Sequence, residues 1–331
     1  MRRKSLLFAV AVCYGVIGLM GCSSGPKEKV LLGPKLKPGS AFTYRSAVDL
    51  AYRQRFSGNE DTLRWRLRKS ATASLIVDEV GPNGSVLVSF RYKHATYDYD
   101  SRKETISYDS AAPPAQVPAR AADVAALIGR GFSARFDPSS RSIELRGLDK
   151  MVQEMIGSLS FSDELEKREV ADDIRNGLTA DIVKESMTGL FDIFPDTPVA
   201  VGDSWKKTVR VASPYAGTSE ITYTLVKRKA GLVTLHTKTK TNMLPAEEPY
   251  RRGNVVMSFN MTGQDEGTLV VDERTGLPVK RTANGKYSGT CRGSVSDPVK
   301  GNVAFTCTQS VRGEVIMELL PLQGEPRQSA K

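Results

Sequence analysis

Residues 62–77, TLRWRLRKSATASLIV, set the fold class of this chain. Apolar side chains share one parity, at Leu63, Trp65, Leu67, Ala71, Ala73, Leu75 and Val77, while arginines and small polar residues occupy most positions of the other parity. A period of two residues is typical of a β-strand with one buried and one solvated face. The stretch therefore predicts a long antiparallel strand whose apolar face packs against another layer or curls around a core.

The same alternation continues on both sides of that stretch. In residues 42–56 the apolar side chains share one parity, and a GPNG turn at residues 81–84 leads into another alternating run at residues 86–92. The period returns within residues 205–271. Glycine, proline and asparagine between such runs mark turns. Several long strands are therefore expected in each half of the chain.

A helical segment separates the two halves. Its apolar residues recur with spacings of three and four, which is the period of an amphipathic helix. Gly157 can end this helix, and Thr179 can cap a later one. The methionine-rich faces are expected to cover a sheet rather than to line a cofactor site. The periodic residues are Leu148, Met151, Val152, Met155 and Ile156.

The two halves begin in a similar way. Residues 37–44, KPGSAFTY, and residues 201–206, VGDSWK, each place a glycine, a small or acidic residue and an aromatic residue at the start of an alternating run. We interpret this as a weak internal duplication. The expected fold is mainly β, with two related curved antiparallel sheets, as half-barrel or sandwich-like lobes, and a helical connector.

This organisation divides the 331 residues into successive segments. They are a signal peptide at 1–21, a flexible tether at 22–36, an N-terminal β lobe at 37–147, a helical connector at 148–194, a C-terminal β lobe at 195–320 and a polar tail at 321–331.

The N-terminal sequence MRRKSLLFAVAVCYGVIGLMGCSS has the organisation of an export signal. Its apolar run at residues 6–20 is shorter than the roughly 20 residues that a transmembrane helix needs. LMGC at residues 19–22 resembles the lipobox of bacterial lipoproteins, in which the cysteine is acylated. The resemblance implies a lipid anchor on Cys22, and Ser23 after it implies the outer membrane, with the protein facing the periplasm.

An ordinary secretory signal, with Cys22 merely near the cleavage point, is the alternative interpretation. Residues 23–29 are polar and contain glycine and proline, which suits a tether behind an acylated cysteine. We therefore expect a lipid-anchored protein of the cell envelope.

The chain carries a formal net charge of +10, including the cationic start of the signal. A basic exported protein can meet anionic lipid headgroups or other acidic envelope components, although solubility alone also accounts for such a charge. Nucleic acid is not expected as a partner, because the envelope separates the two.

The cysteines predict one disulfide. Cys13 leaves with the signal and Cys22 is acylated, so Cys291 and Cys307 remain in an oxidising compartment. Both lie eight residues from Val299, in a DPVKG turn, so a symmetric hairpin places them opposite each other on its apolar side. The histidines have no neighbours at zinc spacing, so no metal site or other cofactor is expected.

A stripe of arginines is the sharpest candidate for a binding site. Arg64, Arg66 and Arg68 lie on one face of the strand, with Arg53 and Arg55 beside them if the preceding strand pairs as a hairpin. Such a stripe can hold phosphates, and we expect it to contribute to association with anionic envelope components rather than to folding. An ordinary solvated strand face is the alternative.

Three further residues are candidates for chemistry. His94 alternates with Phe90 and Tyr92 and is therefore expected on the buried face of a strand. Asp98 and Asp100 share one face, where they could bind a cation or act as acid and base, or simply lie on a solvated strand edge. An envelope hydrolase that uses His94 or the Asp98 and Asp100 pair is the alternative function.

Two short motifs carry a resemblance. VGDSW at residues 201–205, preceded by FPDTPV at residues 194–199, is similar to an uncharacterised family of exported bacterial proteins. The resemblance implies an exported, β-rich protein and no known activity. A nucleophilic role for Ser204 is not favoured, because the second glycine of a nucleophile elbow is absent.

These observations favour a non-catalytic envelope lipoprotein that binds an amphiphile or a partner protein, or serves a structural role. The binding and structural roles differ in one observable: whether an apolar cavity remains after the helices dock on the sheet.

Overall fold

The computed structural model describes residues 28–59, 61–161, 163–211, 216–246, 249–297 and 299–321. The predicted signal peptide, Cys22 and the tail from residue 322 onward lie outside these ranges. None of the helices in the described ranges is long and apolar enough to span a membrane.

The first half of the chain supplies six strands and a short helix. They are β1 (Ala41–Phe56), β2 (Thr62–Val80), β3 (Val86–Ser101), β4 (Thr105–Asp109), α1 (Ala122–Ala126), β5 (Gly131–Asp137) and β6 (Ser142–Arg146).

The second half supplies the remaining strands. They are β7 (Ser204–Val211), β8 (Ala216–Lys229), β9 (Leu232–Leu244), β10 (Tyr250–Arg252), β11 (Val255–Asp272), β12 (Pro278–Asp297) and β13 (Gly301–Leu320).

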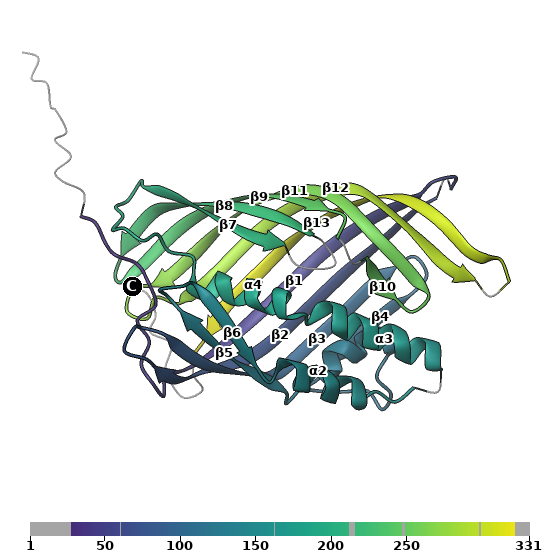
Figure 1. Cartoon of the computed structure of the whole chain (residues 1–331), viewed down its shortest axis with the longest axis horizontal. Coiled ribbons are helices and arrows are strands. Elements are labelled where there is room, and N and C mark those ends of the chain that lie inside the picture. Colours follow the sequence, from purple (N-terminus) through teal and green to yellow (C-terminus); the bar gives the residue numbers. More distant parts are fainter. Residues whose placement is uncertain are drawn as a thin grey trace, which may run out of the picture.

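All these strands belong to one antiparallel sheet, which curves strongly around the helices (Figure 1). The strand order is β6-β5-β3-β2-β1-β13-β12-β11-β9-β8-β7, with β4 on β3 and β10 on β11. The predicted mainly β, antiparallel fold class is confirmed, but the two halves share one sheet instead of forming two. The reason is that β1 pairs with β13 from Thr43 opposite Leu320 to Phe56 opposite Cys307, which satisfies the backbone groups of two otherwise exposed edges.

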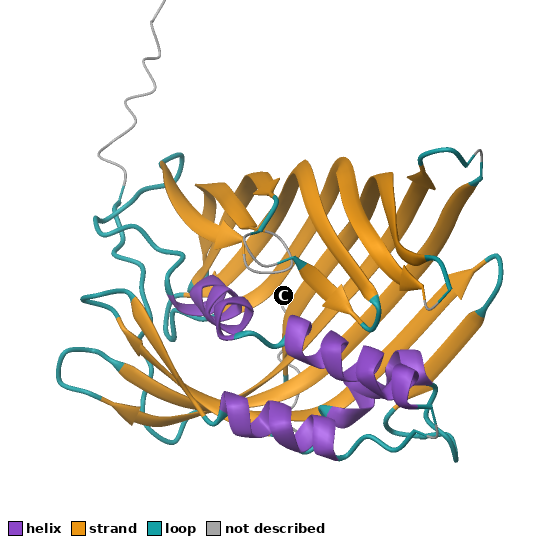
Figure 2. Cartoon of the chain, turned by 45° about the vertical axis from the view of Figure 1, so that its right-hand side comes forward, coloured by secondary structure: helices purple, strands orange, loops and turns teal. Residues whose placement is uncertain are grey.

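The helices lie between the edge strands β6 and β7, on the concave side of the sheet (Figure 2). They are α2 (Leu148–Gly157), α3 (Glu164–Gly177) and α4 (Ala180–Phe191). The predicted start and end of α2 are confirmed, as is the cap of α4, where the Thr179 hydroxyl accepts a hydrogen bond from Ile182 N at 3.3 Å.

Two separate cores hold the helical segment against the sheet. In the first, Met151 and Met155 of α2 pack with Phe132 and Phe136 of β5 and with the inward face of β2. Each such buried side chain contributes roughly 1.5–3 kcal/mol. The second core is built on the far half of the sheet, from Leu225, Leu235, Val271 and the segment after α4.

The predicted tether is packed over part of its length, which corrects that expectation. Val30 forms an isolated bridge with Val199, and Leu32 and Leu36 are buried. These apolar side chains lie in the two cores, so residues 30–36 belong to the folded domain.

Candidate functional site

A cavity of about 370 Å³ lies between the concave face of the sheet and α4. Along β11, Val271 and Leu269 belong to one core and Met261 and Phe259 to a third cluster around the disulfide, while Asp265 lies between them at the cavity. The apolar part of the wall includes Leu50, Ile221, Met261, Ala283, Val311 and Val315. The cavity is thus a gap between separately packed regions of one sheet.

Small residues at inward-facing positions create this space. Gly285 of β12 pairs with Gly313 of β13, so neither strand projects a side chain into the cavity at that level. The ring of Tyr287 lies over the sheet at Gly263, where an added Cβ would collide with it, and near Gly285, where the Cβ would come within 2.8 Å of it. Because these glycines have no side chains, the Tyr287 ring can lie flat against the sheet with its hydroxyl directed toward β11.

Tyr287 and Asp265 form a polar pair on the cavity wall. The Tyr287 hydroxyl donates a hydrogen bond to Asp265 Oδ2 at 2.9 Å, while Oδ1 of the same carboxylate is buried without a partner among the described residues. Burial and the negative charge of Asp265 raise the pKa of Tyr287. Burial also raises the pKa of Tyr223, another wall residue, to about 12. Both tyrosines are therefore neutral at physiological pH.

Two described cationic side chains, Lys207 and Arg281, line the cavity, and they differ in whether they form an ion pair. Lys207 Nζ lies 2.8 Å from Asp192 Oδ1, and both side chains are largely buried. Arg281, on an inward-facing position of β12, has neither an ion pair nor a hydrogen bond with the residues that the structure describes. Its guanidinium lies beside α4, because a Cβ added at Gly189 would be 3.9 Å from Arg281 Nη1.

The predicted arginine stripe lies on the opposite, convex face of the sheet. Arg66 Nε and Nη2 donate to the two carboxylate oxygens of Asp49 at 2.6 and 2.5 Å. On the other side, the register partners of Arg66 and Arg68 in β3 are Asp100 and Asp98. The structure thus brings together two candidate groups that the sequence analysis treated separately, as facing charges of opposite sign.

The carboxylates of that pair also accept hydrogen bonds from β4. Ser107 Oγ donates to Asp98 Oδ1 at 2.7 Å, and Thr105 Oγ1 donates to Asp100 Oδ1 at 3.2 Å. This arrangement is that of a solvated, charge-complementary strand face.

The prediction that His94 faces the core is wrong. The register of β2 and β3 shifts between Thr72 and Ala73, which pair with His94 and Tyr92 and leave Lys93 as an extra residue. Such a bulge reverses the parity of all later positions. The His94 side chain is 38% exposed and its Nε2 lies 2.7 Å from Asp109 Oδ1.

We expect replacements of Arg64 and Arg66 to differ in their effects on the melting temperature and on vesicle binding. Arg64 lies opposite Arg53, a like charge, whereas Arg66 is paired with Asp49. Replacing Arg66 with Gln should lower the melting temperature by about 1 °C, and replacing Arg64 with Gln should leave it unchanged or raise it slightly. Arg64→Gln should also weaken cosedimentation with anionic vesicles at low salt more than Arg66→Gln. Equal vesicle binding by both variants and the wild type would assign the stripe to solvation alone.

The predicted disulfide is confirmed. Cys291 pairs with Cys307 in the register of β12 and β13, their Cα atoms are 5.0 Å apart, and both residues are buried. Gln54 Nε2, on β1, donates to Cys307 Sγ at 3.2 Å. The bridge therefore ties the last hairpin together on its inward face.

The VGDSW motif forms the turn that starts β7. Gly202 has a φ of +101°, a conformation that favours glycine, and Asp203 Oδ2 accepts a hydrogen bond from Ala200 N at 2.9 Å. Ser204 Oγ lies 2.8 Å from Thr224 Oγ1 rather than beside a catalytic base. Trp205 stacks on Tyr223 and donates from Nε1 to Ile193 O at 2.8 Å. The motif thus anchors the segment after α4 to the sheet.

Asp265, Arg281 and Tyr287 line the cavity but were not among the site residues predicted from the sequence. A signal for them exists, since Arg281 and Tyr287 share the parity of Cys291 and are therefore inward facing once the hairpin register is known. The glycines of the same parity, such as Gly285 and Gly289, mark the place where side chains are missing.

Several solved structures show distant similarity to this chain. A structure described as lipid–protein interactions in lipovitellin is 8% identical, covers 90% of this chain and 27% of its own, and has a TM-score of 0.42. Pseudomonas aeruginosa OpdQ is 8% identical over 87% of this chain and 100% of its own, with a TM-score of 0.18. A DUF1329 family protein from Desulfovibrio piger is 10% identical over 85% and 87% of the two chains, with a TM-score of 0.13. At these scores the structures do not bear on function.

The chain spans about a quarter of lipovitellin, the first of these structures. A comparison with curated proteins finds no match. The model of the family of unknown function DUF6263 matches residues 83–278, more than half of the sequence, and the chain therefore belongs to that family.

Proposed function

We propose that this protein is a lipid-anchored, non-catalytic lipoprotein of the cell envelope that binds an amphiphile on the concave face of its sheet. The observation that supports the proposal is the cavity that remains after α4 docks. Ligand pockets have volumes of roughly 300–1,000 Å³ and apolar walls with a few polar groups. The cavity matches that description, with wall residues such as Ile221 and Val311 beside Tyr223, Asp265 and Arg281.

A purely structural role fits this arrangement less well. Protein interiors are normally close packed, and unfilled space next to apolar side chains loses contact energy. Val315 lines the cavity and is nevertheless 39% exposed.

A catalytic role is not supported by the groups that line the cavity. Asp265 accepts a hydrogen bond from Tyr287, and Asp192 is paired with Lys207. Neither histidine of the chain lines the cavity, and His236 Nε2 lies 2.7 Å from Glu266 Oε1. The described polar groups of the wall therefore fit ligand recognition.

The start of the folded domain limits how far it can lie from the membrane. Glu28 Oε1 is 2.8 Å from Arg228 Nη1, and Val30 is bridged to Val199. The chain between Cys22 and Glu28 can span at most about 20 Å. With an acylated Cys22, the end of the sheet that carries Arg228 therefore lies close to the bilayer.

Blocking the cavity should abolish binding of an apolar probe. In Val315→Trp the larger side chain enters the cavity from an exposed position, so folding is little affected. Excluding two or more methylene groups of the probe should weaken binding at least about tenfold. The measurement is a fluorescence titration with N-phenyl-1-naphthylamine, together with the melting temperature of each variant.

The matched control is Val226→Trp, at a valine of β8 that is 47% exposed and does not line the cavity. It should bind the probe as the wild type does. If the wild type does not bind the probe, or if both variants lose binding equally, the proposed cavity function is wrong.

A further inference from the structure

We infer that the cavity selects amphiphiles with an anionic head group, a carboxylate or a phosphate monoester, and that Arg281 holds that group. This inference rests on the proposed function and names the chemical class of its ligand. It follows from the charges on the cavity wall and from the way in which they are paired.

Arg281 is half-buried next to apolar side chains and forms no ion pair with the described residues. Its register partners are Leu269 of β11 and Met317 of β13; Leu269 is buried, and Met317 packs against the first core. The side chain lines the cavity and ends beside Gly189 of α4. A cation in such a position costs free energy unless it is paired. Among the described residues no carboxylate forms an ion pair with it.

The other charged groups on the wall each have at least one contact within the protein. Lys207 is paired with Asp192, the Asp265 carboxylate accepts a hydrogen bond from Tyr287, and Glu185 on α4 is engaged in an interaction of its own. Arg281 is thus a wall cation that forms no ion pair with the residues that the structure describes. A guanidinium presents a planar fork of N–H donors that matches a carboxylate or a phosphate.

Tyr223 supplies a second donor near the same end of the cavity. Tyr223 is buried, and its hydroxyl has no hydrogen-bond partner in the part of the chain that the structure describes. Tyr223 lies opposite Thr237 of β9, and the register continues through Gly267 of β11 to Ala283, two positions from Arg281 on β12. An acceptor-only head group would satisfy Arg281 and Tyr223 together.

Asp265 does not oppose this placement, because it lies at another level of the sheet. Its register partner is Gly285, whereas Arg281 lies opposite Leu269, four positions further along β11. Four residues of a strand correspond to roughly 13 Å. The head group therefore lies at the level of Arg281 and not at the level of Asp265.

The inference is tested by calorimetric titration of the chain from residue 22, carrying Cys22→Ala, with four probes. They are dodecanoate, dodecyl phosphate, dodecyl maltoside and inorganic phosphate, and dodecanol is titrated into the wild type as an uncharged reference. Arg281→Gln should weaken dodecanoate and dodecyl phosphate about 10- to 100-fold, the range for a lost charge-assisted pair, and leave dodecyl maltoside within about twofold. Arg281→Lys, which keeps the charge and loses the fork, should be intermediate.

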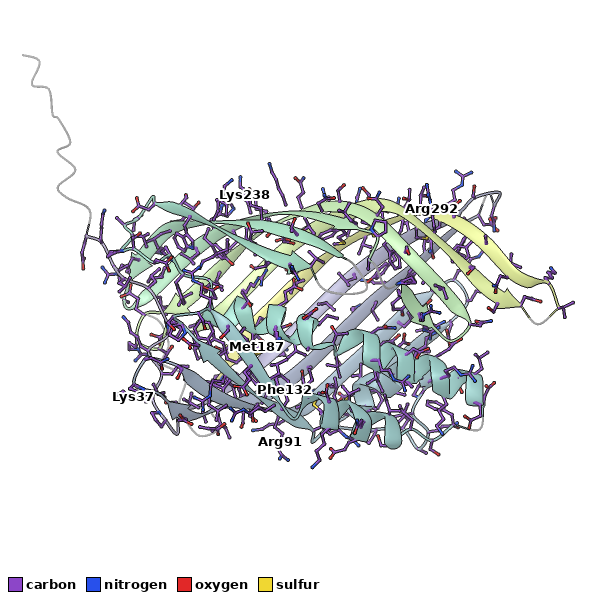
Figure 3. All side chains as sticks on the ribbon, in the orientation of Figure 1. Lys37, Arg91, Phe132, Met187, Lys238 and Arg292 are labelled. Carbon is purple, nitrogen blue, oxygen red and sulfur yellow. A yellow bond between two sulfur atoms is a disulfide. The ribbon has the colours of Figure 1, made fainter. Side chains whose placement is uncertain are left out.

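The matched control is Arg292→Gln on the same strand. Arg292 is exposed, and Figure 3 shows it on the outer surface of the sheet. This variant should bind all four probes as the wild type does. Should Arg281→Gln fail to fold, the preference of the wild type for dodecanoate over dodecanol gives the same information without a variant.

Each contrary result has a separate meaning. Equal affinity of the wild type for dodecanoate, dodecanol and dodecyl maltoside would overturn the head-group inference and leave the proposed function standing. Binding of inorganic phosphate as tightly as dodecyl phosphate would show an anion site without a role for the alkyl chain, and would overturn the inference. Binding of none of the amphiphiles would overturn the proposed function with it.

Discussion

Replacing both Cys291 and Cys307 with alanine is expected to lower the free energy of unfolding by about 3 kcal/mol. The two cysteines are 16 positions apart in sequence, so the bridge closes a loop of intermediate length and restricts the unfolded chain. The loss also affects the folded state, because both residues are buried against Phe259 and Met261. Gln54 Nε2 would lose its sulfur acceptors as well.

Urea unfolding of the oxidised wild type and of the double variant measures this difference. The matched control is Thr290→Ala with Thr308→Ala, the next cross-strand pair on the same strands, which faces outward. That control should change stability by less than about 1 kcal/mol. Two reactive thiols in the unfolded, unreduced wild type, or equal stability of the wild type and the alanine variant, would contradict the prediction.

Replacing Cys22 with alanine is expected to move the protein from the membrane fraction to the soluble fraction. Acyl chains bind a bilayer with about 0.8 kcal/mol per buried methylene, so two or three chains outweigh any surface attraction of the folded domain. Cell fractionation with immunoblotting measures the distribution, and mass spectrometry of the N-terminal peptide detects the lipid.

The control for this experiment is Cys13→Ala, which changes a cysteine within the apolar run of the predicted signal and should leave the protein membrane-bound. A wild-type protein in the soluble fraction would count against acylation. So would a Cys22→Ala variant that stays on the membrane with unchanged mass.

The period of two residues was sufficient to predict the strands, because the pleat of an extended chain forces alternate side chains to opposite faces. It could not predict that β1 pairs with β13, since the pattern says which face of a strand is buried and not which strand lies beside it. Two expected sheets therefore became one. The disulfide was predictable because its register depends only on a local turn, centred on Val299, between two adjacent strands.

His94 shows the limit of parity as a guide. One extra residue at Lys93 turns His94 outward and brings Ala95 and Tyr97 to the buried face. The alternation of Phe90 and Tyr92 does not predict that bulge. The stability of a bulge depends on the neighbouring strands, which the local sequence does not contain.

The sequence was sufficient to predict which residues of β12 face inward, but it could not predict that a cavity lies above them. The parity of Arg281, Gly285 and Tyr287 follows from the hairpin with Cys291, so the inward position of these residues is a local property. Whether space remains above them depends on how far the sheet curves and where α4 docks, which are set by contacts between residues distant in sequence. Arg281 and α4 are also distant in sequence, so only the folded structure places the guanidinium beside Gly189 at the cavity.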